Sequence, residues 1–504
     1  MSELISPTAE DLKIVGHHLG RFSRVLSFLL LPPALVACLY SEFNLLPSFL
    51  LGFSLSLIIC ALLEHGCTTE RDMELKHAIV VAALLWLMAP FFGSLPLWFS
   101  GHYGSFLNSF FESTSGFTGT GLTLTQRADL LPRSINFFRH LLQFVGDGIG
   151  IVVISLCILG RTQIGSFLLF KGEAREMGIR PSIVRTSRRI AGIAFTFLIL
   201  GTLLFTLAGT WEGQKPSDAF FDGLNHSMTA YATGGFSTHS QNLLYYHSFL
   251  IEVVALILMI LGSLNFNLHY AVLTGRRGEM LRDIEVRFFI LSMLIGCLLV
   301  GSYLSHSFYP STLTAFRKGF FHLVSAQTTT GFQTAPGSYI MYLWPVPVLL
   351  VLSALMIIGG SANSTSGGIK NLRVGILFKS LLLEIRKTFL PSSAVAGETY
   401  YHLGRNPITE VVIRGAAVVA LSYLLLLGTG TLITASFGYP LGPSLFESAS
   451  ALANAGLSCG ITSPSMPAAL KLTYIFLMWA GRLEIIAIFV LFGFILLQLR
   501  KALR

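Results

Sequence analysis

Four stretches of the chain combine small hydroxyl residues with glycine and lie beside long apolar runs. Each places a Ser or Thr six residues before a glycine, and an apolar residue five positions before that hydroxyl residue. At membrane depth, non-helical backbone is tolerated only where it is buried in protein or lines water. Extended backbone at such places can present carbonyl oxygens that replace the hydration shell of a cation. These residues therefore predict coordination of a dehydrated cation.

The residues that we assign to this coordination follow the Ser or Thr of each stretch. They are Thr118, Gly119, Thr120 and Gly121; Ala232, Thr233, Gly234 and Gly235; Thr328, Thr329, Thr330 and Gly331; and Ala453, Asn454, Ala455 and Gly456. One such segment alone would be interpreted as an ordinary loop rich in Gly and Thr. Four segments in the same register favour a ring around one axis. The fourth segment has little hydroxyl character, so this ring is not fourfold symmetric.

Each segment needs an element that positions it. The residues before it suffice for one to two turns of helix, and the C-terminal end of such a helix carries a partial negative charge that favours a cation. The segment itself needs at least one glycine for a positive φ or a close approach of backbone. The predicted unit is therefore a span, a short half-helix, a glycine strand and a second span.

Long apolar runs supply the spans, each of which needs about 20 residues. The predicted spans are Phe22–Tyr40, Leu45–Leu63, His77–Ser100, Phe137–Leu159, Ile190–Thr210, Leu243–Leu264, Phe288–His306, Leu343–Gly360, Val411–Ala435 and Ala468–Leu497. We expect an all-α polytopic membrane protein with ten transmembrane helices. Four pseudo-symmetric helix–pore loop–helix repeats would surround a central pore, with an N-terminal helical hairpin added. The expected units are residues 1–76 for the leader and hairpin, then 77–160, 161–270, 271–368 and 369–504.

Composition and charge agree with a membrane protein. The 504 residues are 53% hydrophobic and only 12% charged, about half the charge of a soluble protein. The net charge of +9 arises mainly from Lys and Arg in the joints between units and in the tail. By the positive-inside rule, both termini and these joints are cytoplasmic and the entrance of the ring faces outward. The sequence lacks the interleaved aromatic and basic residues that are typical of nucleic-acid-binding proteins.

A second glycine-rich stretch interrupts the apolar run of the third unit. It contains Gly359, Gly360, Gly367 and Gly368 and ends at Lys370. Its glycines disfavour a helix by roughly 1 kcal/mol each. It is either a gate loop that crosses below the ring or a cytoplasmic turn that ends a helix. A nucleotide-binding P-loop is excluded because the GxxxxGK[ST] pattern is absent.

Two charged residues fall within predicted spans. Arg482 would lie inside the last span, where an ionised group is costly and marks a pathway or a partner. It could act as an electrostatic barrier to cations, or form a structural pair with Glu484 or another acid. Asp147 could face a water-filled cavity or serve helix packing. His226, His239 and His322 lack a metal-ligand spacing, and we assign them no metal.

Taken together, the motifs resemble the Trk/Ktr/HKT superfamily of potassium transporters, and the N-terminal hairpin resembles the TrkH type. The resemblance rests on the four units, on 115–121, 232–238 and 328–332, on the 359–370 loop and on 481–484. It implies that the filter glycines are Gly121, Gly235, Gly331 and Gly456, that the 359–368 loop is the gate, and that Arg482 lies below the filter. Glycine at 121, in place of the serine of some sodium-permeable plant relatives, implies potassium. The Asp at 147 departs from the Gly-Gly usual in the family.

The resemblance also implies a biological setting. It is a multi-pass protein of the bacterial inner membrane, in contact with lipid, and a homodimer in which each protomer has its own pore. A cytoplasmic nucleotide-binding subunit of the TrkA type would gate it. Potassium is then the transported ion, held at the filter residues only, with no bound cofactor. The sequence contains no nucleophile elbow, HExxH motif or paired-carboxylate pattern, so it gives no sign of an enzyme.

Two transport mechanisms follow. The first is potassium uptake through a selective, channel-like pore driven by the membrane potential. The alternative is a proton- or sodium-coupled potassium symporter. That mechanism needs a titratable acid within the membrane, and Asp147 is the candidate.

Overall fold

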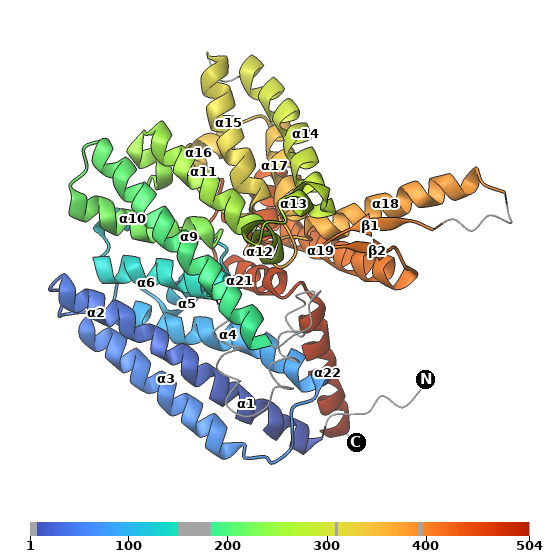
Figure 1. Cartoon of the computed structure of the whole chain (residues 1–504). Helices are drawn as coiled ribbons and strands as arrows, with labels where there is room; N and C mark the ends of the chain where they lie inside the picture. Colours follow the sequence, from blue (N-terminus) through green and yellow to red (C-terminus); the bar gives the residue numbers. More distant parts are fainter. Residues whose placement is uncertain (1–7, 150–182, 308–310, 392–396, 503–504) are drawn as a thin grey trace.

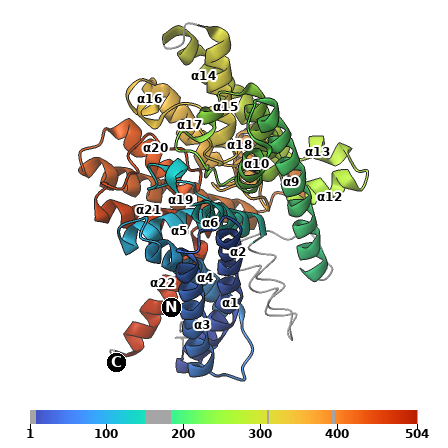
Figure 2. The same ribbon diagram turned by 90° about the vertical axis from the view of Figure 1, so that its left-hand side faces the viewer.

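The described part of the chain is mostly helical, as the computed structural model shows (Figure 1). The structure describes residues 8–149, 183–307, 311–391 and 397–502. In both views α1 (Ala9–Ser27), α3 (Leu46–Gly66) and α4 (Leu75–Phe99) lie side by side (Figure 2). The short hairpin of β1 (Thr399–Tyr401) and β2 (Arg405–Pro407) is antiparallel and pairs Tyr401 with Arg405.

The first predicted span begins earlier than its apolar run. Thr8 caps α1 through a capping box with Asp11, so residues of the predicted leader already belong to the helix. Helix α1 continues through η1 (Phe28–Leu30) into α2 (Leu31–Leu39) as one 31-residue segment. Gln498 near the end of the chain donates to the Thr8 carbonyl at 3.1 Å. The start of α1 and the end of the last helix therefore lie next to each other.

The remaining elements follow the order of the predicted units. The first unit has α4, α5 (Phe106–Phe117), η2 (Ala128–Leu130), α6 (Arg133–Gln143) and the π-helical η3 (Phe144–Ile149). The second has α9 (Ile183–Trp211), α10 (Pro216–Tyr231), η4 (Asn242–Tyr246), α11 (Phe249–Ser263) and the start of α12 (Phe266–Leu273). The third has α13 (Gly278–Arg282), α14 (Ile284–Ser307), α15 (Thr312–Gln327), α16 (Gly337–Tyr342) and α17 (Val346–Ile358). The fourth has α18 (Asn371–Thr388), α19 (Glu410–Ser436), α20 (Leu441–Leu452), α21 (Ala468–Arg482) and α22 (Ile486–Ala502).

Within the described ranges, six helices are long and apolar enough to cross a membrane, or up to eight if each bent helix pair is one span. The predicted span at 343–360 is represented by the shorter helix α17 of 13 residues. The predicted span at 137–159 starts in α6 and continues beyond residue 149, outside the described residues. The protein is therefore a helical polytopic chain, and the number ten stays a prediction.

Two pairs of consecutive helices are sharply bent, one within the last predicted span and one at the end of the span predicted at 243–264. The last predicted span is broken by 110° between α21 and α22, where Glu484 and Ile485 have φ values of 50° and 69°. Arg482 therefore lies at the C-terminal end of α21, at the break of the last predicted span. Helix α11 turns by 102° into α12. Asn265 caps α12 by accepting the Asn267 N–H.

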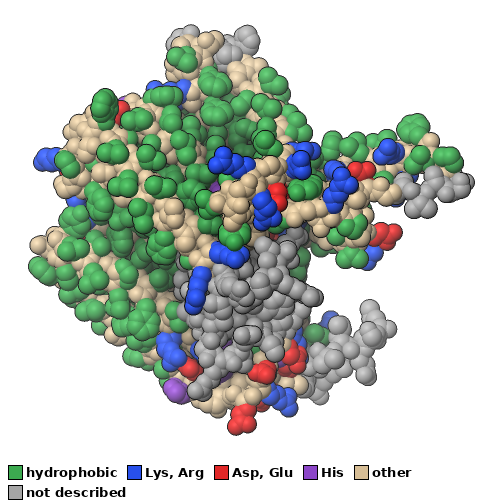
Figure 3. All heavy atoms as spheres, viewed as in Figure 1, with side chains coloured by type: hydrophobic (Ala, Val, Ile, Leu, Met, Phe, Trp, Pro, Cys, Tyr) green, Lys and Arg blue, Asp and Glu red, His purple; other side chains and the backbone are tan. Residues whose placement is uncertain are grey.

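The outer surface is largely apolar. Leu35, Leu298 and Leu425 are 66%, 76% and 72% exposed, and hydrophobic side chains cover much of the face in Figure 3. Apolar patches of this extent mark contact with lipid or another apolar phase. Most of the polar groups that the next subsection describes are buried inside this apolar shell.

Candidate cation-binding site

The four predicted coordinating segments share one backbone conformation. Each begins where a short helix ends, because Thr118, Ala232, Thr328 and Ala453 are the C-caps of α5, α10, α15 and α20. The next residue in each has a positive φ, between 50° and 66°. The last glycine of each has a φ between 75° and 92°. The tolerance of glycine for this region explains why the fourth position is Gly in all four.

The four terminal glycines lie against one another. A Cβ atom added to Gly121 would come within 3.0 Å of the Gly234 carbonyl oxygen. A Cβ added to Gly235 would come similarly close to the Thr330 carbonyl oxygen, and one added to Gly331 to the Ala455 carbonyl oxygen. A Cβ added to Gly456 would approach the Thr120 carbonyl oxygen, so the contacts lead back to the first segment and form a closed circuit. Main chain thus meets main chain at every junction, and no junction leaves room for a side chain.

A repeated hydrogen bond ties each segment to its helix. The N–H of Thr120 donates to the Ser115 carbonyl at 2.9 Å, and the N–H of Gly234 donates to the Thr229 carbonyl at 2.8 Å. The Thr330–Ser325 and Ala455–Ser450 pairs repeat this bond at 2.9 Å. The Ser or Thr of each stretch therefore anchors its segment through backbone, while the hydroxyls of Thr229 and Ser325 bond carbonyls further along, at Phe236 and Phe332.

Buried carboxylates hold the chain after two of the segments, and the sequence analysis missed them. Glu112 of α5 accepts the Leu124 N–H at 2.9 Å and forms a buried ion pair with Arg139 at 2.8 Å. Glu447 of α20 accepts the Cys459 N–H at 2.9 Å. Both acids stand nine residues before the last glycine of their segment. That shared position was the available signal, because an acid repeated within an apolar half-helix needs a partner.

The second segment is held by a side chain from α6. The Gln143 amide donates to the Gly234 carbonyl at 2.5 Å and accepts the Phe236 N–H at 3.1 Å. Gln143 was also missed, since an isolated Gln in an amphipathic helix gives no sequence signal. The Gln143 side chain thus forms hydrogen bonds with a carbonyl of the second segment and with an N–H just after it, and we do not assign it as a ligand of the cation.

The mouth outside the ring is polar. A hollow there is lined by the four terminal glycines together with residues such as Arg139 and His239. The His239 ring meets Asp129 at 2.8 Å and Asp222 at 3.1 Å. Burial alone would lower the pKa of His239, but the Asp222 and Asp129 carboxylates outweigh burial and raise that pKa above its ordinary value.

The 359–370 loop lies against the inner ends of the segments. The Gly367 N–H donates to the Thr329 hydroxyl at 2.7 Å, and the Thr233 hydroxyl donates to that of Thr365 at 3.0 Å. The Gln327 amide donates to the Gly359 carbonyl at 2.8 Å. Residues 359–370 are buried. Gly360, Gly368 and Lys370 belong to the same loop, in which the Lys370 ammonium donates to the Ser366 carbonyl.

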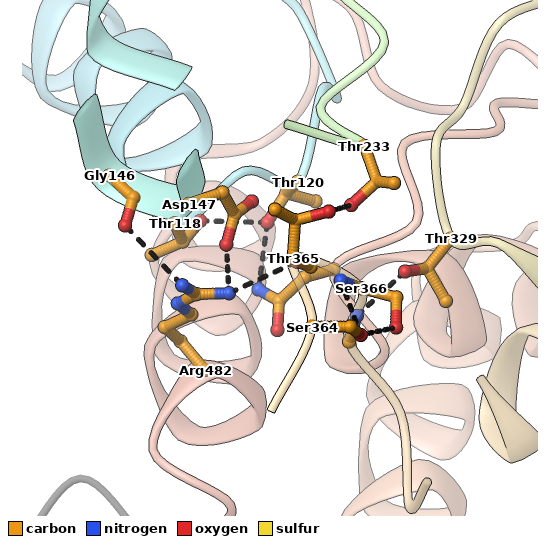
Figure 4. A network of polar contacts seen from close by, with 12 residues as sticks. Thr118, Thr120, Gly146, Asp147, Thr233, Thr329, Ser364, Thr365, Ser366 and Arg482 are labelled. Carbon is orange, nitrogen blue, oxygen red and sulfur yellow. Dashed lines mark hydrogen bonds and ion pairs between the residues drawn. The ribbon is translucent and has the colours of Figure 1, made fainter. Parts of the chain in front are cut away.

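Arg482 pairs with Asp147, not with Glu484 (Figure 4). Its guanidinium also donates to the carbonyls of Gly146 at 3.3 Å and Thr365 at 3.5 Å. Asp147 lies directly behind the first segment, since a Cβ on Gly119 would overlap its carboxylate. Glu484 instead pairs with Arg373 of α18. The two charges noted in the sequence therefore neutralise each other beside the loop.

Asn454 shows why the fourth segment differs in composition. Its side-chain amide donates to the Thr120 hydroxyl at 2.9 Å and to the Met478 carbonyl at 2.8 Å. The amide thus links the fourth segment to the first and to α21. Its neighbours Ala453 and Ala455 are fully buried and approach the loop and the third segment, respectively, through their carbonyls.

Comparison with known proteins adds an independent finding. A family model described as TrkH, a cation transport protein, matches residues 45–499. An uncharacterized cation transporter of Methanocaldococcus jannaschii is 34% identical over 486 residues, which cover 96% of each chain. The Trk system potassium uptake protein TrkH of Salmonella typhimurium is 31% identical over 475 residues, covering 91% of this chain and 94% of its own.

A solved structure has the same fold. The crystal structure of the potassium transporter TrkH from Vibrio parahaemolyticus matches with a TM-score of 0.81 and 28% sequence identity. The match covers 95% of this chain and 98% of that one. The resemblance inferred from the motifs is therefore confirmed. This chain belongs to the TrkH family of cation transport proteins.

Proposed function

We propose that this protein takes up potassium through a selective, channel-like pore in the bacterial inner membrane. The observation that carries the proposal is the closed circuit of main chain at Gly121, Gly235, Gly331 and Gly456. Carbonyl oxygens held in such a circuit can replace the water of a monovalent cation. The names of the relatives, which describe potassium uptake, favour potassium as the cargo.

The ligands of the ion are the carbonyls of the four segments. They come from 118–121, 232–235, 328–331 and 453–456. The C-terminal ends of α5, α10, α15 and α20 point their partial negative charge toward the same place. Because backbone supplies the ligands, an alanine at 453 or 455 serves as well as a threonine.

The membrane potential drives the ion. Each unit charge that crosses gains about 2.3 kcal/mol per 100 mV, which concentrates a cation without nucleotide hydrolysis by this chain. The protein is a transporter and not an enzyme. We place both termini and the basic joints in the cytoplasm, where Lys and Arg are retained.

The 359–370 loop is the gate, and Arg482 and Asp147 hold it. The loop touches the inner ends of the second and third segments through Thr365 and Gly367. The Thr365 carbonyl also accepts from Arg482. A cytoplasmic nucleotide-binding subunit of the TrkA type would move the loop, and the pore would work as a homodimer with one pore in each protomer.

Ion flux in liposomes tests the proposal. Purified protein should pass potassium in preference to sodium, and an imposed voltage, negative inside, should increase potassium entry. Gly121→Ser should raise the sodium-to-potassium permeability ratio, because its hydroxymethyl group would displace the Gly234 carbonyl. An unchanged ratio would remove the ligand assignment, and equal fluxes of both ions in the wild type would remove potassium selectivity.

Coupled symport is the second candidate, and a buried acid behind the first segment motivates it. Asp147 is 2% exposed and lies beside Gly119. Its ion pair with Arg482 gives this acid a structural partner, which favours the channel. Symport predicts that Asp147→Asn abolishes the pH dependence of potassium uptake. The channel mechanism predicts that Asp147→Asn leaves the pH dependence of uptake unchanged. The same substitution should make the gate loop less stable, because Arg482 contacts both Asp147 and the loop.

A further inference from the structure

A cluster of potential metal ligands lies at the base of the third unit, away from the ring. Asp283 and Glu285 flank the first residue of α14, and His402 lies in the turn between β1 and β2. The ligand atoms of the three side chains all lie within 4.8 Å of one another. Elements more than 100 residues apart in the sequence thus bring two carboxylates and one imidazole together.

The distances within the cluster suit one small cation. The Nδ1 atom of His402 lies 3.1 Å from Oδ2 of Asp283 and 3.7 Å from Oε2 of Glu285. Nitrogen and oxygen ligands of tetrahedral zinc lie about 2.0–2.2 Å from the metal, so neighbouring ligand atoms are about 3.4 Å apart. An ion at the centre would need only small movements of the side chains.

The charge of the cluster also calls for a cation. Asp283 and Glu285 are both fully buried, and burial of two neighbouring carboxylates is costly unless positive charge compensates them. A neutral imidazole together with a divalent ion would balance both carboxylates. Imidazole with carboxylate is a donor set of transition metals, whereas Mg²⁺ and Ca²⁺ prefer oxygen alone.

We propose that Asp283, Glu285 and His402 form a binding site for one divalent transition-metal ion, represented by Zn²⁺. Three protein ligands leave the fourth position to water. Outer groups already orient the ligands, because the Leu403 N–H donates to Asp283 and the Asn265 amide donates to Glu285, both at 3.3 Å. Such partners fix ligand orientation and raise metal affinity.

The site is accessible from the surface. His402 and its neighbour Leu403 line a hollow together with Tyr400 of β1 and Arg373 of α18. The His402 side chain is 14% exposed, while the two carboxylates lie behind it. An ion can therefore approach through the hollow and meet the histidine first.

The site connects directly to the 359–370 loop. Oε1 of Glu285 accepts the Ala362 N–H at 2.5 Å. The loop backbone also bonds the α11–α12 bend, through Ser361 to Ser263 and through Phe266 to Asn363, at 3.0 Å each. A metal that fixes Glu285 would hold Ala362, and so would keep the loop in its present position. This regulatory consequence rests on the proposed function, whereas metal binding itself does not.

Metal binding is tested with the purified full-length protein and ZnCl2 by isothermal titration calorimetry. We expect one ion per chain at this site, and His402→Ala should weaken it by at least about tenfold. Asp283→Asn keeps the shape of the side chain and should weaken zinc binding by a similar factor. This second variant tests the site even if His402→Ala does not fold. His247→Ala removes an exposed histidine elsewhere and should change nothing. No zinc binding by the wild type, or zinc binding by the His402 and Asp283 variants that is as tight as that of the wild type, would overturn the site.

The link to the loop has two readouts. Amide hydrogen exchange at residues 361–366 should slow when zinc is added to the wild type and remain unchanged in His402→Ala. Potassium flux into liposomes should fall with zinc in the wild type only. Unchanged exchange with zinc bound would refute the link. Absence of potassium flux from metal-free protein would contradict the proposed function, while the calorimetry and the exchange would still decide the metal site.

Discussion

The ring of glycine segments and the 359–370 loop beneath it are both irregular backbone buried among helices, but different forces hold them. In the ring, the space that a Cβ would need at Gly121 or Gly235 is filled by a carbonyl of the next segment. The loop also has close main-chain contacts at Gly359 and Gly367, but its hydroxyl side chains add hydrogen bonds to the surrounding backbone. Thr365 bonds the carbonyls of Tyr231 and Gly262, and Ser364 bonds Ser366.

Under the proposed function, this difference would separate a rigid ring from a loop that can move. Interdigitated main chain has no alternative position without lifting a neighbouring segment, because packed interiors do not deform gradually. A hydrogen bond contributes only about 0.5–1.5 kcal/mol net, and water or another hydroxyl can replace the partner. Steric closure suits coordination of an ion, and exchangeable hydrogen bonds suit opening and closing.

The largest effect is expected from adding a methyl group to the ring. Gly235→Ala should abolish selective potassium flux, because the new Cβ would overlap the Thr330 carbonyl. Gly101→Ala is a matched control, since Gly101 has the same φ of 75° but nothing within 4 Å of its added Cβ. The control should lose about 1–2 kcal/mol of stability from strain and keep its flux. Liposome flux and thermal unfolding would be measured for both variants.

If both alanine variants lost flux equally, conformational strain and not closure of the ring would explain the result. That result would refute the claim that close packing of main chain holds the ring.

An intermediate effect of opposite sign is expected in the loop. Deleting residues 363–365 should raise basal potassium flux without a cytoplasmic partner, and Thr365→Val should raise it less, because it removes only the hydroxyl bonds. Thr196→Val is the control, because Thr196 is exposed and its hydroxyl donates to the Gly192 carbonyl of its own helix. Flux that is equal before and after deletion would instead favour a passive turn.

The smallest effect is expected from protonation of His239, at the outer mouth of the ring. Its pKa is raised in the fold by Asp222 and Asp129 against the effect of burial. The stabilisation is therefore fully present below the ordinary pKa of 6.5 and is lost as the pH rises through the higher pKa of the folded protein. The thermal midpoint should be slightly higher at pH 6 than at pH 9.

His239→Gln should reduce this difference, and the wild-type minus variant comparison removes the contribution of other groups. The acids Asp129 and Asp222 and the rings of Tyr245 and Tyr246 are the neighbours that face His239. An identical pH dependence in wild type and variant would assign the effect to another group.

Much of the helical architecture could be predicted from apolar runs, because a lipid phase imposes length and hydropathy on each span. The errors lie where local backbone overrides hydropathy. The run at 468–497 is mainly apolar, yet the positive φ values of Glu484 and Ile485 break it after Arg482. The span predicted at 343–360 is represented by a helix that begins only after Pro345, whereas its predicted end agrees with Gly359, whose φ of 74° ends the helix.

The spacing of hydroxyl residues and glycine determined by itself where four segments of similar backbone would occur, because positive φ and close approach select glycine locally. The partners of the charges were decided only by tertiary structure. Arg482 is two residues from Glu484 but pairs with Asp147, and His402 meets Asp283 and Glu285 across a whole unit. Pairing of buried charges depends on which surfaces meet after the helices pack, and no local pattern in the sequence encodes that meeting.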